Sequence, residues 1–160
     1  MVLHQDLINM GFTISDVEIS DFDVYFAIGR ICYEKYVDEY FGGWVQDVQI
    51  KMNADAFNNA VKQTTFKKIV LNGIVVGFFA FDELNDKIDG VSIQMIEIAR
   101  NMGVGSFYLT HIVSLSERDK KPIFLKVFKS NPAQNLYRRF GFEIYDETFS
   151  HYLMRYTPVG

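Results

Sequence analysis

Apolar residues recur along the chain with two different periods, and these periods predict both helices and strands. Residues 22–40 carry apolar side chains at helical spacing, and the Gly-Gly pair at 42–43 stands where a helix is expected to stop. Looser periodicity predicts a second helix over residues 45–62. An alternating run that starts at Phe12 and breaks near Asp16 predicts a short strand ahead of these helices.

The middle of the chain is typical of β-structure. Two runs rich in β-branched and aromatic residues, 66–71 and 74–81, are separated by Asn-Gly at 72–73. Asn-Gly between such runs is a strong hairpin signal, because a type I′ turn needs positive φ at both central residues. The polar residues 85–90 predict another turn, which leads into a strand over residues 91–97.

The last third of the chain alternates between helical and strand patterns. The predicted elements are a helix at 106–116, a strand at 123–128, a helix at 132–140 and strands at 142–145 and 151–156. Mixed strands with helices between them indicate an α/β sandwich around one central sheet. Because no repeat, low-complexity tract or linker interrupts the chain, we expect residues 1–160 to form a single domain.

Bulk composition narrows the class of protein. Of the 160 residues, 49% are hydrophobic, which is enough for a sizeable core, and the formal net charge is −4. The negative balance argues against nucleic acid and anionic membranes as partners, and no apolar run approaches the ~18 residues of a membrane span. Cys32 is the lone cysteine, which suits a reducing compartment. We therefore expect a soluble, cytoplasmic protein.

The junction between the strand at 91–97 and the next helix has the composition of a phosphate-binding loop. It reads Arg100-Asn-Met-Gly-Val-Gly105 and is followed by Ser106 at the helix start. A helix N-terminus offers unpaired N–H groups and a partial positive charge, and glycines let the backbone approach a ligand closely. A dinucleotide fingerprint would need a third glycine at Tyr108, and a P-loop would need Lys-Ser/Thr after its last glycine. Taken alone, two such glycines after a strand are weak evidence for a phosphate site, and the simpler interpretation is a tight strand-to-helix turn.

A second motif lies between residues 131 and 142, Asn-Pro-Ala-Gln-Asn-Leu-Tyr-Arg-Arg-Phe-Gly-Phe. Asn131 and Pro132 form a helix start, because Asn caps and Pro loses nothing at the first helical position. Apolar residues then recur at helical spacing, and Gly141 suits a left-handed helix end.

Together, R-x-x-G-x-G after a strand and N-x-A-x-x-L-Y-x-x-x-G-F resemble the GNAT superfamily of acyl-CoA-dependent N-acyltransferases. The segments around residues 123–132 and 147–155 are similar to a bacterial subgroup of unassigned acceptor. The resemblance implies an α/β fold with a GNAT-like mixed central sheet of about six to seven strands flanked by helices. It implies acetyl-CoA as co-substrate, with the acetyl group passing to a primary amine by direct attack. Glu97 and Asn101 depart from the proline and glycine that many relatives carry.

The resemblance also implies which residues meet the cofactor. These are Ile98, Arg100, Met102, Gly103, Val104, Gly105, Ser106, Asn131, Ala133, Leu136 and Tyr137. In many relatives the tyrosine of L-Y-x-x-x-G-F protonates the departing thiolate, which assigns the role of catalytic acid to Tyr137. The alternative role of Tyr137 is packing in the core, as for Leu136. For Asn131, contact with cofactor and the role of cap are compatible.

The base and the acceptor site are less defined by the sequence. Glu97, at the end of a strand, is a candidate base, with an exposed loop position as the equal alternative; His151 is the second candidate, against a packed histidine. The histidines lack ligand spacing, so we expect no metal. Tyr33, Tyr36 and Trp44 lie where the family places its acceptor-binding helices, although such a stripe is more often core.

Several functional questions therefore stay open at this level. The acceptor is a small-molecule amine or a peptide N-terminus, and a homodimer is compatible with the sequence. The alternative to an enzyme is a catalytically silent CoA-binding or protein-interaction module on the same fold. Nucleic-acid binding lacks a basic patch beyond Arg138-Arg139.

Overall fold

The computed structural model describes residues 1–62 and 65–159. In chain order, the elements are α1 (Gln5–Asn9), β1 (Phe12–Asp16), η1 (Ile19–Asp21), α2 (Phe22–Phe41), α3 (Gln46–Ala60), β2 (Thr65–Leu71), β3 (Ile74–Glu83), β4 (Ile88–Met95), η2 (Glu97–Ala99), α4 (Val104–Asp119), β5 (Ile123–Phe128), α5 (Ala133–Arg139), β6 (Glu143–Glu147) and β7 (His151–Tyr156).

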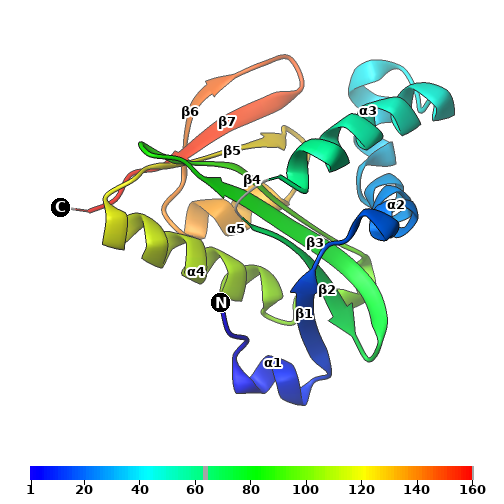
Figure 1. Cartoon of the computed structure of the whole chain (residues 1–160). Helices are drawn as coiled ribbons and strands as arrows, with labels where there is room; N and C mark the ends of the chain where they lie inside the picture. The colour runs from blue at the N-terminus through cyan, green and yellow to red at the C-terminus, as the bar shows by residue number, and fades with distance from the viewer. Residues whose placement is uncertain (63–64, 160) are drawn as a thin grey trace.

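The strands form one mixed sheet of seven strands in the order β1-β2-β3-β4-β5-β7-β6. Strands β1 to β4 are an antiparallel meander, β4 and β5 are parallel, and β5, β7 and β6 are antiparallel again. The helices flank this sheet, with α4 and α5 on one side and α2 and α3 on the other (Figure 1). The predicted fold class is confirmed.

The hairpin between β2 and β3 forms as predicted. Leu71 pairs directly with Ile74, so the loop contains two residues. Asn72 has φ 50° and Gly73 has φ 83°, the left-handed pair that a type I′ turn requires. The hairpin thus fixes the register next to the turn, and an irregularity at Val76 shifts it by one residue farther along β3.

Several predicted elements differ from the structure in their bounds, most clearly at β4 and α4. Strand β4 begins at Ile88, although residues 85–90 were expected to be a turn. Gly90 has φ 63° inside the strand, close to a register shift against β3, so the polar and glycine signals mark an irregular strand. Helix α4 starts at Val104, two residues before the expected start, and the short helix α1 was not predicted.

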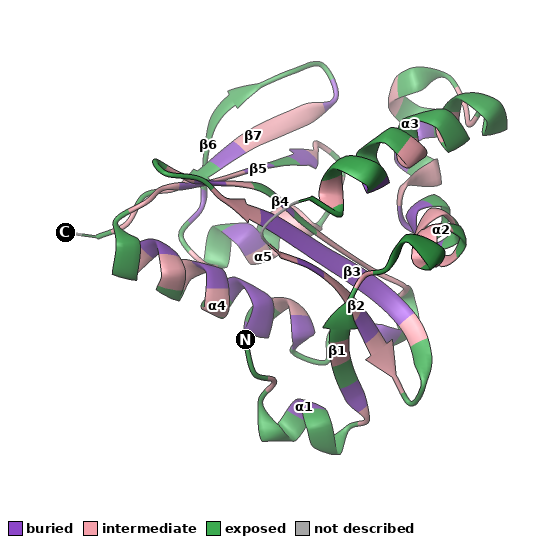
Figure 2. Ribbon diagram, viewed as in Figure 1, coloured by how far each residue is buried: buried purple, intermediate pink, exposed green. Residues whose placement is uncertain are grey.

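Successive side chains of β3 enter two separate hydrophobic clusters on the two faces of the sheet. Phe79 packs on the α4 side, where the Tyr108 ring stacks on it with centroids 4.2 Å apart. Phe78 packs on the other side, against the aromatic rings of Tyr25 and Phe66. Figure 2 shows the buried central strands between the two helical layers. Among the described residues, no helix combines the length and apolar character needed to cross a membrane.

Candidate functional site

A cleft opens through the sheet where β4 and β5 separate. The two parallel strands share a single pair, Ile88 with Ile123, and diverge beyond it. The resulting cavity has a volume of about 430 Å³ and is lined by residues 89–93 of β4 and 124–128 of β5. Backbone groups of β4 that would otherwise pair with β5 therefore face this space.

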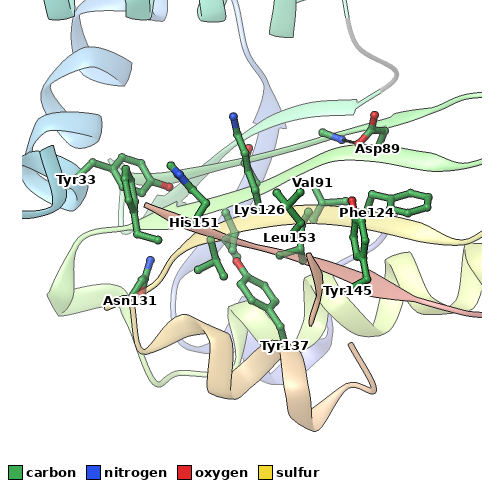
Figure 3. A pocket seen from close by; sticks show the side chains of 16 residues that line it. Tyr33, Asp89, Val91, Phe124, Lys126, Asn131, Tyr137, Tyr145, His151 and Leu153 are labelled. Atoms are coloured by element: carbon green, nitrogen blue, oxygen red, sulfur yellow. Dashed lines mark hydrogen bonds between the residues drawn. The ribbon is translucent and has the colours of Figure 1, made fainter. Parts of the chain in front are cut away.

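Tyr137 enters the cleft from the α5 side. Its ring is buried, with 6% of its surface exposed, and its hydroxyl points into the gap between the strands (Figure 3). Within the part of the chain that the structure describes, this hydroxyl makes no hydrogen bond. Burial raises the pKa of Tyr137 to about 12, so the group keeps its proton throughout the neutral range. The arrangement provides a protonated, unengaged donor inside the cleft.

Tyr33 and His151 line the cleft from the opposite face of the sheet (Figure 3). Both rings pack against Phe128, with centroid distances of 6.2 Å for Tyr33 and 4.1 Å for His151. Burial raises the pKa of Tyr33, and a negative charge on Tyr137 would raise it further. Tyr33 and His151, which are far apart in the sequence, therefore lie together at the cleft.

His151 is arranged as a neutral imidazole. Its Nδ1 lies 2.7 Å from the Ser150 hydroxyl oxygen. Desolvation lowers the pKa of His151, and the positive charge of Lys126 lowers it further. In the tautomer whose Nδ1–H donates to Ser150, the other ring nitrogen is free to accept a proton.

The loop between β4 and α4 presents unpaired amides, as an anion site requires. Asn101 has φ 61° and Gly103, the N-cap of α4, has φ 95°. Among the described residues, no acceptor takes the N–H groups of residues 103–106, and the first turn of α4 holds no acidic side chain. The Val104 side chain is buried in the core, so this residue offers its backbone alone. Ser106 is exposed on the first turn.

Helix α5 packs closely beside this loop. A Cβ on Gly105 would lie 3.0 Å from the Leu136 Cδ2 atom, so the glycine permits the approach of the two helices. Ala133 packs against the same core, and its N–H donates to the Asn131 side-chain oxygen at 2.9 Å. Asn131 lines the cleft as well as capping. The two sequence motifs are thus brought side by side.

Three other predicted cofactor residues, Ile98, Arg100 and Met102, do not line the cleft. Ile98 and Met102 are exposed, with 69% and 39% of their surfaces accessible. The Arg100 Nε atom donates to the Met95 carbonyl at 2.7 Å, and one terminal nitrogen lies 3.9 Å from the Cys32 sulfur. Arg100 thereby ties the loop to the end of β4.

Not all predicted site residues reach the cleft. Glu97 is exposed in η2, beyond the end of β4, and does not line the cavity. Tyr36 is buried, and its ring stacks on Phe128 at 5.0 Å rather than facing open space. The Trp44 indole N–H donates to Gln46, and Arg30 lies 5.3 Å from the ring centroid. Of the three aromatic residues proposed for the acceptor, Tyr33 is the one that lines the cleft.

Two charged side chains of the cleft, Asp89 and Lys126, were not predicted. Lys126 interrupts the apolar strand β5 on the face opposite Leu125 and Val127, and this interruption was the available signal. Asp89 was hidden in a segment expected to be a turn. In the described ranges 1–62 and 65–159, no group of three or more His, Cys, Asp or Glu residues could hold a metal ion.

Comparisons with known proteins agree with this geometry. The model of the family described as acetyltransferase (GNAT) matches residues 30–142. No curated protein is similar enough in sequence to match the chain.

Solved structures of N-acetyltransferases share the fold at low sequence identity. PaiA N-acetyltransferase of Thermoplasma acidophilum, in complex with coenzyme A, has a TM-score of 0.69 and 15% identity over 92% of this chain and 99% of its own. The Escherichia coli ribosomal-protein-S18-alanine N-acetyltransferase has a TM-score of 0.66 and 18% identity, covering 93% and 96%. Arabidopsis thaliana Naa50, bound to the bisubstrate analogue CoA-Ac-MVNAL, has a TM-score of 0.63 and 20% identity, covering 92% and 99%.

Proposed function

The chain belongs to the acetyltransferase (GNAT) family, and we propose that it transfers an acetyl group from acetyl-CoA to a primary amine by direct attack. The observation that carries this proposal is the cleft between β4 and β5, with the protonated Tyr137 hydroxyl inside it. The acceptor is the amine of a small molecule or of a peptide N-terminus. We propose that residues 1–160 form one cytoplasmic N-acetyltransferase-like domain.

The fit to acetyl-CoA rests on the loop before α4. Its unpaired amides and the positive end of the α4 dipole suit a pyrophosphate, with backbone contributions from Gly103, Val104 and Gly105 and a hydroxyl from Ser106. When bound there, acetyl-CoA supplies the activated acyl group. Ile98 and Met102 add exposed apolar side chains beside this loop, Ala133 and Leu136 add apolar side chains from α5, and Asn131 adds an amide at the cleft. Arg100 holds the loop through the Met95 carbonyl.

Backbone and side-chain groups of the chain carry out the remaining steps of the reaction. Backbone N–H groups of β4 beyond Ile88 face the cleft, where they can donate to a carbonyl oxygen that gains charge. Tyr137 donates its proton towards the departing sulfur. His151, neutral because its pKa is lowered, accepts the proton that the amine loses. We assign the base to His151 rather than Glu97 because His151 lines the cleft and Glu97 does not.

A thiol-release assay with acetyl-CoA against a panel of amines and N-terminal peptides tests the proposal. We expect release that depends on an amine, with product mass increased by one acetyl group. Tight binding of acetyl-CoA without thiol release for any amine would refute the transfer reaction. That outcome would favour a CoA-binding module.

A further inference from the structure

A second cavity adjoins the cleft on the side of α2 and α3. It has a volume of about 240 Å³ and lies between these two helices and strands β2 to β4. Tyr33 and Ser92 line both cavities. An amine held in the cleft can therefore extend its substituent into this second space.

The side chain of Gln94 gives this cavity a specific chemistry. Gln94 lines it, and its Nε2 atom is buried from solvent without a hydrogen-bond partner, alone in this among the residues described in the structure. The side-chain oxygen lies 3.8 Å from where a Cβ on Gly29 would lie. Of the two amide atoms, the oxygen is the one that is not buried, and a hydroxyl on a ligand in the cavity would donate a hydrogen bond to it.

The remaining walls are aromatic or small. Tyr25 makes edge contacts with Phe66 and Phe78 there, and these two rings lie tilted against each other. Ala56, Ala60 and Ala80 leave the space open. Within the described chain, no charged residue lines the cavity. An apolar cavity of about 150 Å³ can bind benzene, so this larger space suits a substituted aromatic ring.

We propose that this cavity receives the substituent of the acceptor amine, and that the substituent is an aromatic ring bearing a hydrogen-bonding oxygen. The inference rests on the proposed function, because it is the reacting amine that must lie in the neighbouring cleft. A 2-arylethylamine with a ring hydroxyl combines these features, either as a free amine such as tyramine or as the N-terminal tyrosine of a peptide. A linear diamine is disfavoured, since its second ammonium would enter a cavity that has no carboxylate.

The test compares kcat/KM for tyramine, 2-phenylethylamine, propylamine and 1,5-diaminopentane in the thiol-release assay. Propylamine is too short to fill the cavity and reports the chemistry of the cleft alone. A peptide amide beginning with tyrosine is the fifth acceptor. The faster of tyramine and this peptide identifies the source of the aromatic group. We expect kcat/KM for the better of tyramine and the peptide to exceed that for 1,5-diaminopentane by at least about tenfold.

Two variants of the cavity lining and one control variant locate the effect. Ala60→Leu adds bulk to the cavity wall from α3, and we expect it to lower the tyramine-to-propylamine ratio by at least about tenfold. Ala54→Leu makes the same change on the same helix outside the cavity lining and should leave the ratio unchanged. Gln94→Leu removes the amide and should lower the tyramine-to-phenylethylamine ratio by about tenfold, because tyramine alone carries the hydroxyl.

A binding measurement separates this inference from the proposed reaction. In the presence of CoA, tyramine should raise the Tm of the protein, and this increase in Tm should be smaller in Ala60→Leu. That result supports the cavity assignment even when no amine is acetylated. Preference for diaminopentane over tyramine would overturn the cavity assignment while the transfer reaction survived. An unchanged ratio in a folded Ala60→Leu protein would overturn it as well.

Discussion

Replacing Tyr137 by phenylalanine isolates a single oxygen atom in the proposed mechanism. The ring is buried, with its centroid 6.0 Å from that of Phe142, and phenylalanine preserves this packing. Within the described residues, the hydroxyl has no hydrogen-bond partner to lose. We therefore expect the free energy of unfolding to change by less than about 1 kcal/mol, which is a Tm shift of only a few degrees for a chain of this size.

The expected loss of turnover follows from the raised pKa. Burial places the pKa of Tyr137 at about 12, whereas an ordinary thiol has a pKa of about 8.5. Complete proton transfer to a thiolate would thus be uphill by roughly 3.5 pKa units, or about 5 kcal/mol. Tyr137 then acts chiefly as a hydrogen-bond donor to the developing charge, an interaction worth about 1.5–3 kcal/mol. A rate loss of about a hundredfold in kcat corresponds to the upper part of this range.

Single-turnover acetyl transfer measures the chemical step directly and is the appropriate assay. Tyr152→Phe is the matched control, since it deletes a tyrosine hydroxyl on β7 outside the cleft lining. CoA affinity, measured by calorimetry, should be nearly unchanged in both variants. If Tyr137→Phe retains full single-turnover rate, Tyr137 is not the acid. If it loses several kcal/mol of stability instead, its role is in the core.

Three further changes test other parts of the structure. Ser106→Glu should stabilise the protein by about 0.3–1 kcal/mol in urea unfolding, because a negative charge at the N-terminus of α4 interacts favourably with the helix dipole. The same charge repels pyrophosphate and should weaken CoA binding at least about tenfold. An equal loss of CoA affinity in Thr110→Glu, farther along the helix, would contradict this site. Wild-type kcat should fall as the pH drops through the lowered pKa of His151, below 6.5, since the imidazolium cannot accept a proton; an identical acid limb in His151→Gln would exclude this base. Gly77→Ala should destabilise by more than about 2 kcal/mol in urea unfolding, because its Cβ would lie 2.4 Å from the Gln94 carbonyl oxygen on β4, and an unchanged midpoint would show that the strands can separate there.

The sequence predicted those parts of the fold whose signals are local. The Asn-Gly turn specifies its own dihedral angles, and the pattern of helices and strands after residue 100 needed only periodicity. The start of β4 could not be predicted in this way. Its polar residues and Gly90 are typical of a turn, and pairing with β3 across an irregular register makes them a strand.

The candidate site was predictable only where a motif carried it. Tyr137 and Asn131 stand in a recognisable pattern, and the structure brings both to the cleft. Gln94 and Lys126 belong to no motif, because their significance arises from the separation of β4 and β5 and from the helices placed above them. For the same reason, the spacing of Trp44 on the chain did not reveal that its indole binds Gln46 instead of facing the cleft.

The two halves of the proposed reaction lie on opposite faces of the sheet. Tyr137 and the loop before α4 belong to the face that α4 and α5 cover, whereas Tyr33 and His151 meet Phe128 on the face towards α2. Paired strands would keep reagents on these faces apart, and β4 and β5 are the neighbours that share a single pair among the described strands. A thioester held on one face and an amine held on the other can therefore meet in the gap between them. The base and the hydrogen-bond donor then approach the reacting atoms from opposite sides, which suits direct attack, since the amine loses its proton on one side and the Tyr137 hydroxyl stabilises the departing sulfur on the other.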